Sequence, residues 1–190
     1  MINSQPPDAI RRRLRPGERI LWSGRPNLNA YAMRGVWYLL PFSIVWLGFA
    51  IFWELGVISS RAPFPFALFG IPFVGMGVYM VFGRLIVATR EAERATYAVT
   101  DQRVILITGA FQPAIVEMDL ADLPPVQLAE AGSGVGTITF GPAMGYRVPP
   151  GWPTMGQALR PTAFESIPDA ATAYRILQDA RSALRPTQMR

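Results

Sequence analysis

Two long apolar segments dominate the hydrophobic pattern of the chain. Residues 35–53 and residues 62–83 contain no charged side chain. At about 1.5 Å of rise per residue, the shorter segment extends about 29 Å, which matches the ~30 Å hydrocarbon core of a bilayer. The pattern therefore predicts two transmembrane helices joined by a short loop over 54–61, that is, a membrane hairpin over 35–83.

A buried core helix and a signal peptide are the two alternatives for these segments. A core helix is rarely so long and so uniformly apolar, and a signal peptide has a shorter apolar core followed by a cleavage site. Here the first apolar segment starts only after residue 34, and a second one follows it. Aromatic residues suited to the membrane interface lie near the ends of both segments: Trp37, Tyr38, Trp53 and Tyr79.

Short alternating segments replace the long apolar ones after residue 83. They are rich in β-branched and aromatic residues and are separated by turn residues, which predicts antiparallel strands. The expected strands cover 95–100, 103–108, 114–120, 126–131, 136–140 and 163–167. The glycine-rich stretch GSGVG precedes one of them and is expected to be a tight turn. Residues 141–161 are rich in proline and glycine, which predicts a long loop.

The hydrophobic period changes once more near the C-terminus. From Asp169 onward, apolar residues follow helical spacing up to Arg185-Pro186: Ala173, Ile176, Leu177, Ala180 and Leu184. Such an amphipathic helix can bury one stripe over an open end of a small sheet. The expected fold is an α+β membrane protein, with a two-helix transmembrane hairpin and a small antiparallel β-barrel or sandwich capped by a C-terminal helix.

The net charge of +5 is concentrated ahead of the first apolar segment. Residues 1–34 contain seven arginines and two acidic residues, whereas residues 84–190 contain ten of each. Positively charged residues near membrane spans stay on the cytoplasmic side. We therefore expect a basic cytoplasmic segment over 1–34, a short outer loop, and a cytoplasmic domain over 84–190, with both termini in the cytoplasm.

The basic stretch AIRRRLRPG, residues 9–17, has three alternative partners. Anionic lipid headgroups are the nearest one for a segment beside a membrane, and another protein is the second. Nucleic acid is not expected, because the stretch lacks the interleaved aromatic residues of a single-strand groove and no nucleic-acid-binding motif surrounds it. The candidate membrane-surface contacts are Arg11, Arg12, Arg13 and Arg15.

The composition removes most catalytic chemistry. The chain contains no cysteine, histidine or lysine, since all 18 basic residues are arginine. Common general bases, thiolate ligands and Schiff-base nucleophiles are therefore missing. Glu117, Asp119 and Asp122 could bind a cation, but an alternating strand normally presents such carboxylates to water. We expect no enzyme activity, no cofactor and no metal.

Four stretches carry a resemblance to a known family. They are ERILWSGRP at 18–26, YAVTDQRVI at 97–105, GTITF at 136–140 and AFESI ahead of the last helix. In this order the chain resembles the bacterial pleckstrin-homology-like membrane proteins with two spans. The resemblance implies a barrel of about seven strands with a C-terminal helix, anchored in the bacterial inner (cytoplasmic) membrane as a multi-pass protein without assigned catalysis. It also implies that residues 18–24 join the sheet. Its signature residues are Tyr97, Thr100, Asp101, Arg103, Gly136 and Ile138.

The polar run Thr100-Asp101-Gln102-Arg103 allows two interpretations. Asp and Thr side chains bond their own backbone at turns, so the run fits a hairpin turn between two strands. A binding role is the alternative.

The expected function is a membrane-anchored interaction or scaffold module that binds another protein, with a strand edge or loop 141–161 as the contact. The alternatives are a homo-oligomer, an accessory subunit of a transporter, respiratory or photosynthetic assembly, and a lipid or small-molecule carrier. The candidate partner contacts are Arg103, Phe111, Met144, Tyr146, Trp152 and Met155.

Overall fold

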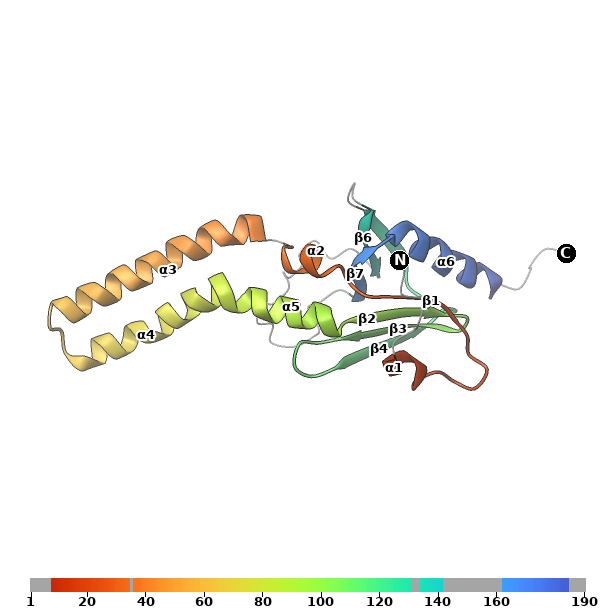
Figure 1. Ribbon diagram of the computed structural model, residues 1–190, viewed down its shortest axis with the longest axis horizontal. Helices are drawn as coiled ribbons and strands as arrows, with labels where there is room; N and C mark the ends of the chain where they lie inside the picture. Colours follow the sequence, from red (N-terminus) through yellow and green to blue (C-terminus); the bar gives the residue numbers. More distant parts are fainter. Residues whose placement is uncertain (1–7, 35, 131–133, 142–161, 185–190) are drawn as a thin grey trace.

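The computed structural model describes residues 8–34, 36–130, 134–141 and 162–184. A long helical hairpin projects from a body that consists of two small antiparallel sheets and a covering helix (Figure 1). The protein is therefore a mixed α+β structure with two long apolar helices. Within the described residues the two sheets do not join into a closed barrel.

The first sheet combines strands from both sides of the hairpin. Its order is β1-β2-β3-β4, and all of its neighbours are antiparallel. Ile20 of β1 lies opposite Thr100 of β2, so the helical hairpin is an insertion between two paired strands. The strands are β1 (Ile20–Gly24), β2 (Thr96–Thr100), β3 (Arg103–Thr108) and β4 (Ala114–Asp119).

The second sheet contains three antiparallel strands in the order β5-β6-β7. They are β5 (Val126–Glu130), β6 (Val135–Phe140) and β7 (Thr162–Pro168). The register shifts between Gly136 and Ile138, which marks an irregularity in the β6–β7 pairing. A Cβ on Gly136 would lie 2.6 Å from the Cβ of Ala170, so glycine allows the following helix to approach this irregularity. The expected long loop over 141–161 lies, apart from Gly141, outside the described residues.

Helix α6 (Ala170–Ala183) covers the core between the sheets, as its hydrophobic period predicts. Its buried stripe contains Ala173, Leu177 and Ala180. At the centre of the core, the ring of Phe164 stacks on Tyr97 with a centroid distance of 4.9 Å and on Trp22 at 5.6 Å. These three rings come from β7, β2 and β1, so they join both sheets into one body.

The hairpin helices are longer than the apolar segments that predict them. They are α3 (Val36–Ser59), α4 (Phe64–Val78), a π-helical turn η1 (Tyr79–Gly83) and α5 (Arg84–Arg94), and the last three form one continuous helix. One expectation is therefore wrong, because the loop over 54–61 is mostly helix. Residues 84–94, for which the sequence predicted no element, form helix α5. Charged residues end an apolar segment, but they do not end a helix, because glutamate and arginine are good helix formers.

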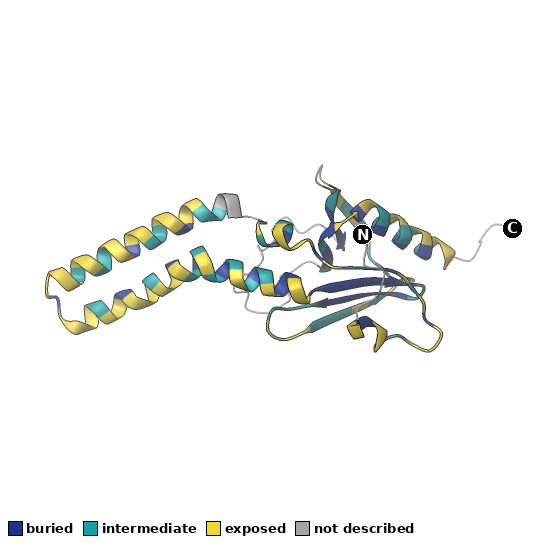
Figure 2. Cartoon of the chain, viewed as in Figure 1, coloured by how far each residue is buried: buried dark blue, intermediate teal, exposed yellow. Residues whose placement is uncertain are grey.

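Exposed apolar side chains cover the hairpin. Leu39–Ser59 and Phe64–Arg94 are both long and apolar enough to cross a bilayer, and only a small share of their side chains is buried within the protein. Figure 2 shows this as mostly exposed residues along α3 and α4, whereas buried residues gather in the sheets. The helices contact each other closely, with Leu47 of α3 beside Gly77 of α4.

Two short helices were not expected from the sequence. Helix α2 (Leu28–Ala32) begins at Asn27, whose Oδ1 accepts a hydrogen bond from the Ala30 amide, and it packs along α5. Helix α1 (Asp8–Arg11) lies on the outer face of the first sheet. There Ile10 is fully buried against Ala98, Ile105 and Ile107, so this sheet has apolar contacts on both faces.

Candidate functional site: a buried polar cluster at the β2–β3 turn

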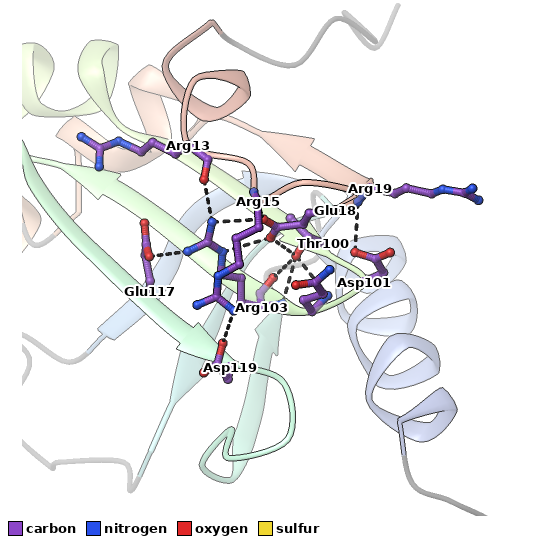
Figure 3. Close-up of polar contacts among 10 residues, drawn as sticks. Arg13, Arg15, Glu18, Arg19, Thr100, Asp101, Arg103, Glu117 and Asp119 are labelled. Carbon is purple, nitrogen blue, oxygen red and sulfur yellow. Dashed lines mark hydrogen bonds and ion pairs between the residues drawn. The ribbon is translucent and has the colours of Figure 1, made fainter.

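The polar run between β2 and β3 forms the centre of a buried polar cluster (Figure 3). The Thr100 hydroxyl oxygen accepts hydrogen bonds from the Gln102 amide at 3.2 Å and the Arg103 amide at 2.9 Å, which closes the tight turn. The same hydroxyl donates to Glu18 Oε1 at 2.7 Å. Asp101 connects to the segment before β1, because its Oδ1 accepts from the Arg19 amide at 3.0 Å.

The Arg103 guanidinium is enclosed by acceptors. Its Nε lies 3.0 Å from Glu18 Oε1 and its Nη2 lies 3.0 Å from Glu18 Oε2, so the pair is two-pronged. Nη2 also donates to the Arg13 carbonyl at 2.6 Å, and Nη1 pairs with Glu117. Arg103 is only 4% exposed. The hypothesis that Arg103 is a surface contact for a partner is therefore wrong, since its donors are turned inward and occupied.

Glu18 is the second buried member of the cluster. Burial alone would raise the pKa of its carboxyl, but hydrogen bonds from Arg103, from the Arg15 amide at 2.7 Å and from Thr100 more than offset this, so the pKa lies below its usual value. The hydrogen bond to Glu18 raises the pKa of Arg103 in turn. The carboxylate and the guanidinium are therefore both in their charged forms near neutral pH, as a buried ion pair.

The cluster binds the N-terminal segment to the β2–β3 hairpin. Arg103 reaches Glu18 and the Arg13 carbonyl on one side and Glu117 of β4 on the other. The Arg15–Asp119 ion pair at its edge is weaker, at 3.4 Å between side chains that are about half exposed. A buried, hydrogen-bonded ion pair of this kind positions a chain segment.

The four arginines expected to contact the membrane belong to this N-terminal segment. The side chains of Arg11, Arg12 and Arg13 are exposed, while Arg15 reaches Asp119. The segment lies against the outer face of the first sheet, away from the hairpin helices (Figure 1). The expected carboxylate face of β4 is also partly paired, because Glu117 and Asp119 both contact arginines. No group of side chains suited to a metal ion is found among the described residues.

The remaining predicted residues fall into three groups. Tyr97 and Ile138 are buried in the core, and burial together with the nearby Glu165 carboxylate raises the pKa of Tyr97. Phe111 lies in the β3–β4 turn and is 66% exposed. Four candidate contacts lie outside the described residues: Met144, Tyr146, Trp152 and Met155.

A second polar cluster connects the hairpin to the other sheet, and the sequence offered no sign of it. Arg34 precedes α3, and its Nη1 lies 3.0 Å from Glu165 of β7. Its Nη2 donates to Thr137 Oγ1 at 2.6 Å and to Ser166 Oγ at 3.1 Å. Ser166 has a positive φ of 49°, which places its side chain at the irregular β6–β7 pairing. From the sequence alone, Arg34 only adds to the positive charge ahead of the first apolar segment.

Two concave regions are present among the described residues. A cavity of about 480 Å³ lies at the hairpin end of the body, lined by residues including Tyr31, Glu91, Tyr97 and Glu165. Its two carboxylates do not suit an anionic lipid headgroup. A second region of about 280 Å³ is an aromatic groove on the hairpin, formed by Trp46, Phe49, Ala50, Trp53, Phe69 and Phe73.

Glu54 follows Trp53, which lines the aromatic groove, and it was expected to lie in the loop between the spans. Helix α3 continues past it, so Glu54 is within a helix that is long enough to span a bilayer. A Cβ on Gly70 would lie 1.7 Å from Glu54 Oε2, so only glycine leaves room for this side chain on α4. Helix α3 therefore extends beyond the predicted span 35–53 and includes one charged residue.

Comparisons with known proteins give one relative. The chain is 29% identical over 190 residues to an uncharacterized 23.7 kDa protein in the puhA 5'region of Rhodobacter capsulatus, and the match covers 94% of this chain and 86% of the relative. No protein-family model matches the chain. No solved structure matches it either.

Proposed function

We propose that the chain is a membrane-anchored, non-catalytic interaction module of the bacterial pleckstrin-homology-like kind, with its body at the cytoplasmic face. The observation that carries the proposal is that an exposed apolar hairpin is inserted between two paired strands of the body. A soluble protein does not expose such a surface without a partner or a membrane. The excess of arginine ahead of α3 favours a cytoplasmic body.

Both ends of the hairpin lie close in sequence to residues that contact the body. On one side, α4, η1 and α5 form one helix that ends two residues before β2. On the other side, Arg34, two positions before the start of α3, pairs with Glu165. A module held in this way has a set orientation to the bilayer. Anchoring also raises its local concentration for a membrane partner, so a modest intrinsic affinity is enough.

The edge strand β4 is a described surface that suits a protein partner. It pairs only with β3 within the described residues, so its other edge has backbone groups open to an added strand. Extended segments of partner proteins bind such edges through main-chain hydrogen bonds. Side chains near this edge, such as Asp119 and Met118, would then select among partners.

The membrane topology is tested first. A reporter fused at Ser59 and the same reporter fused at the C-terminus should lie on opposite sides of the membrane. If both reporters gave the same side, the hairpin would not span the bilayer and the proposal would fail.

The partner surface is tested in the native membrane. A photo-crosslinking residue at Asp119 of β4 should give a discrete protein adduct, whereas the same residue at the exposed Leu21 of β1 serves as the matched control. The complex should also survive affinity capture in mild detergent. If Asp119 and Leu21 gave the same pattern and capture returned no protein above background, binding through β4 would be ruled out.

An accessory subunit of a larger membrane complex is the second candidate function. The aromatic groove on α3 and α4 favours it, because aromatic side chains line a concave surface on the hairpin itself. This candidate predicts co-purification at a fixed stoichiometry, measured by native mass spectrometry. The name of the Rhodobacter relative supplies one protein to look for among the co-purifying subunits, namely the product of puhA.

A further inference from the structure

The exposed hydrophobic side chains of the body gather at its hairpin end. Outside α3, α4 and η1, the described residues include six large hydrophobic side chains that are exposed: Leu21, Leu28, Met33, Ile86, Phe111 and Leu184. Four of the six belong to α2, to the residue after it, to α5 and to the β3–β4 turn. Phe111 and Met33 are the most exposed of these six side chains, at 66% and 61%.

These four positions belong to elements that are packed together. Helix α2 lies along α5, and α5 contacts β3. At the end of α5, Arg94 Nη1 donates to the Ala110 carbonyl at 2.7 Å and to the Phe111 carbonyl at 3.4 Å. The turn is further constrained at Gly109, which has a φ of 112° and where a Cβ would lie 2.1 Å from the Gln112 carbonyl oxygen. These contacts fix the conformation of the turn that carries the exposed Phe111 side chain.

The lengths of the helices place this end of the body beside the membrane surface. Phe64–Gly83 is an uncharged helical stretch of about 30 Å, and the charged residues of the same helix begin at Arg84. At the other end of the helical hairpin, α2 ends only four positions before α3 begins. The β3–β4 turn points back along α5 toward the hairpin (Figure 1).

Exposed basic side chains lie on or next to the same elements. Arg25 precedes α2, and Arg90 and Arg94 lie on α5; all three side chains are exposed. The exposed acidic side chain on α5 is Glu93. Aromatic and aliphatic residues bordered by arginines are typical of surfaces that lie in the interface of an anionic membrane.

We propose that Leu28, Met33, Ile86 and Phe111 form a membrane-facing edge that rests on the cytoplasmic leaflet, with Met33 and Phe111 inserted among the headgroups of anionic lipid. The inference rests on the proposed function, because it requires the hairpin to span the bilayer. It goes beyond anchoring by assigning a second, peripheral contact to the body. The β2–β3 turn and its Arg103 cluster then face away from the membrane, where they leave β4 accessible from the cytoplasm.

The natural absence of cysteine makes this inference directly testable. A nitroxide label attached to a single cysteine, introduced as Phe111→Cys or Met33→Cys in the full chain, reports whether the position is reached by oxygen from the lipid or by a water-soluble nickel reagent. Leu21→Cys and Leu184→Cys are the matched controls, since they start from exposed hydrophobic residues elsewhere on the body. Phe49→Cys is the reference within the hairpin. The purified chain is reconstituted into phosphatidylcholine vesicles with and without phosphatidylglycerol.

We expect the labels at Phe111 and Met33 to be severalfold less accessible to the nickel reagent than the labels at Leu21 and Leu184. This difference in accessibility should be larger in vesicles that contain phosphatidylglycerol. The Arg25→Gln, Arg90→Gln double variant should lose the phosphatidylglycerol dependence. If the Phe49 label lay in lipid while Phe111 and Met33 matched the controls, the membrane-facing edge would be overturned and the anchor retained; a protein partner would then be the occupant of this surface. An aqueous Phe49 label would overturn the anchor and the edge together.

Discussion

Arg103 of β3 and Glu18, which precedes β1, form a buried two-pronged ion pair with both N–O distances at 3.0 Å, although they are 85 positions apart in the sequence. The whole helical hairpin lies between them along the chain. Their pairing therefore closes the N-terminal segment onto a hairpin of strands that is synthesised much later. The polar run over 100–103 therefore holds the segment before β1 against the β2–β3 hairpin.

Removing the arginine should destabilise the body strongly. Arg103→Ala leaves Glu18 buried without its partner, which typically lowers the free energy of unfolding by about 3–5 kcal/mol. Arg103→Lys keeps the charge but loses the planar fork, so we expect an intermediate loss of about 1–3 kcal/mol. Thermal unfolding of the protein in detergent measures both values.

The exposed ion pair beside the cluster supplies the control. Arg15→Ala breaks the half-exposed contact with Asp119, and we expect a change below about 1 kcal/mol. If Arg15→Ala and Arg103→Ala lowered the free energy of unfolding equally, the Arg103–Glu18 pair would contribute no more to stability than an exposed ion pair.

The stability of the body should fall in mild acid because of Glu18. The folded pKa of this carboxyl lies below its unfolded value of about 4.5, so its contribution is complete above that pH and is lost as the pH falls through the lower folded pKa. The variant Glu18→Gln should be less stable at neutral pH and should show a shallower decline below about pH 5. Asp122→Asn, which changes an exposed carboxylate, serves as the matched control. Parallel curves for wild type and Glu18→Gln would contradict the assignment.

The strands were predictable and the two clusters were not, for a physical reason. Strands such as 103–108 and 126–131 follow from a period of two and from nearby turn residues, and the structure confirms them to within one or two residues. Partners such as Arg103 and Glu18 meet only through sheet register, which no local pattern encodes. Helix α5 was not predicted, because the charged residues from Arg84 onward end the apolar pattern although they continue the helix. The glutamate at the start of ERILW, next to a strand, was the one available signal for the cluster.

Arg34 should couple the hairpin to the second sheet. Arg34→Ala removes the contacts with Glu165, Thr137 and Ser166, and it leaves the mostly buried Glu165 carboxylate without its arginine. We expect faster amide hydrogen exchange in β6 and β7 and no change in β2 and β3. Arg25→Ala, at an exposed arginine nearby, should leave the exchange pattern unaltered. Exchange that increased equally in both sheets would indicate general destabilisation instead of a local connection.

The packing of α4 against α3 should require glycine at position 77 but not at position 75. A Cβ on Gly77 would lie 3.0 Å from the Leu47 Cα and Cβ on α3, whereas a Cβ on Gly75 would meet nothing within 4 Å. Alanine favours a helix over glycine by about 1 kcal/mol at either position. Gly75→Ala should therefore be neutral or slightly stabilising, and Gly77→Ala should be destabilising because α3 has to move away from the new methyl group. Spin labels on α3 and α4 would measure an increased distance in Gly77→Ala only, and identical distances in both variants would contradict the close helix contact at Leu47.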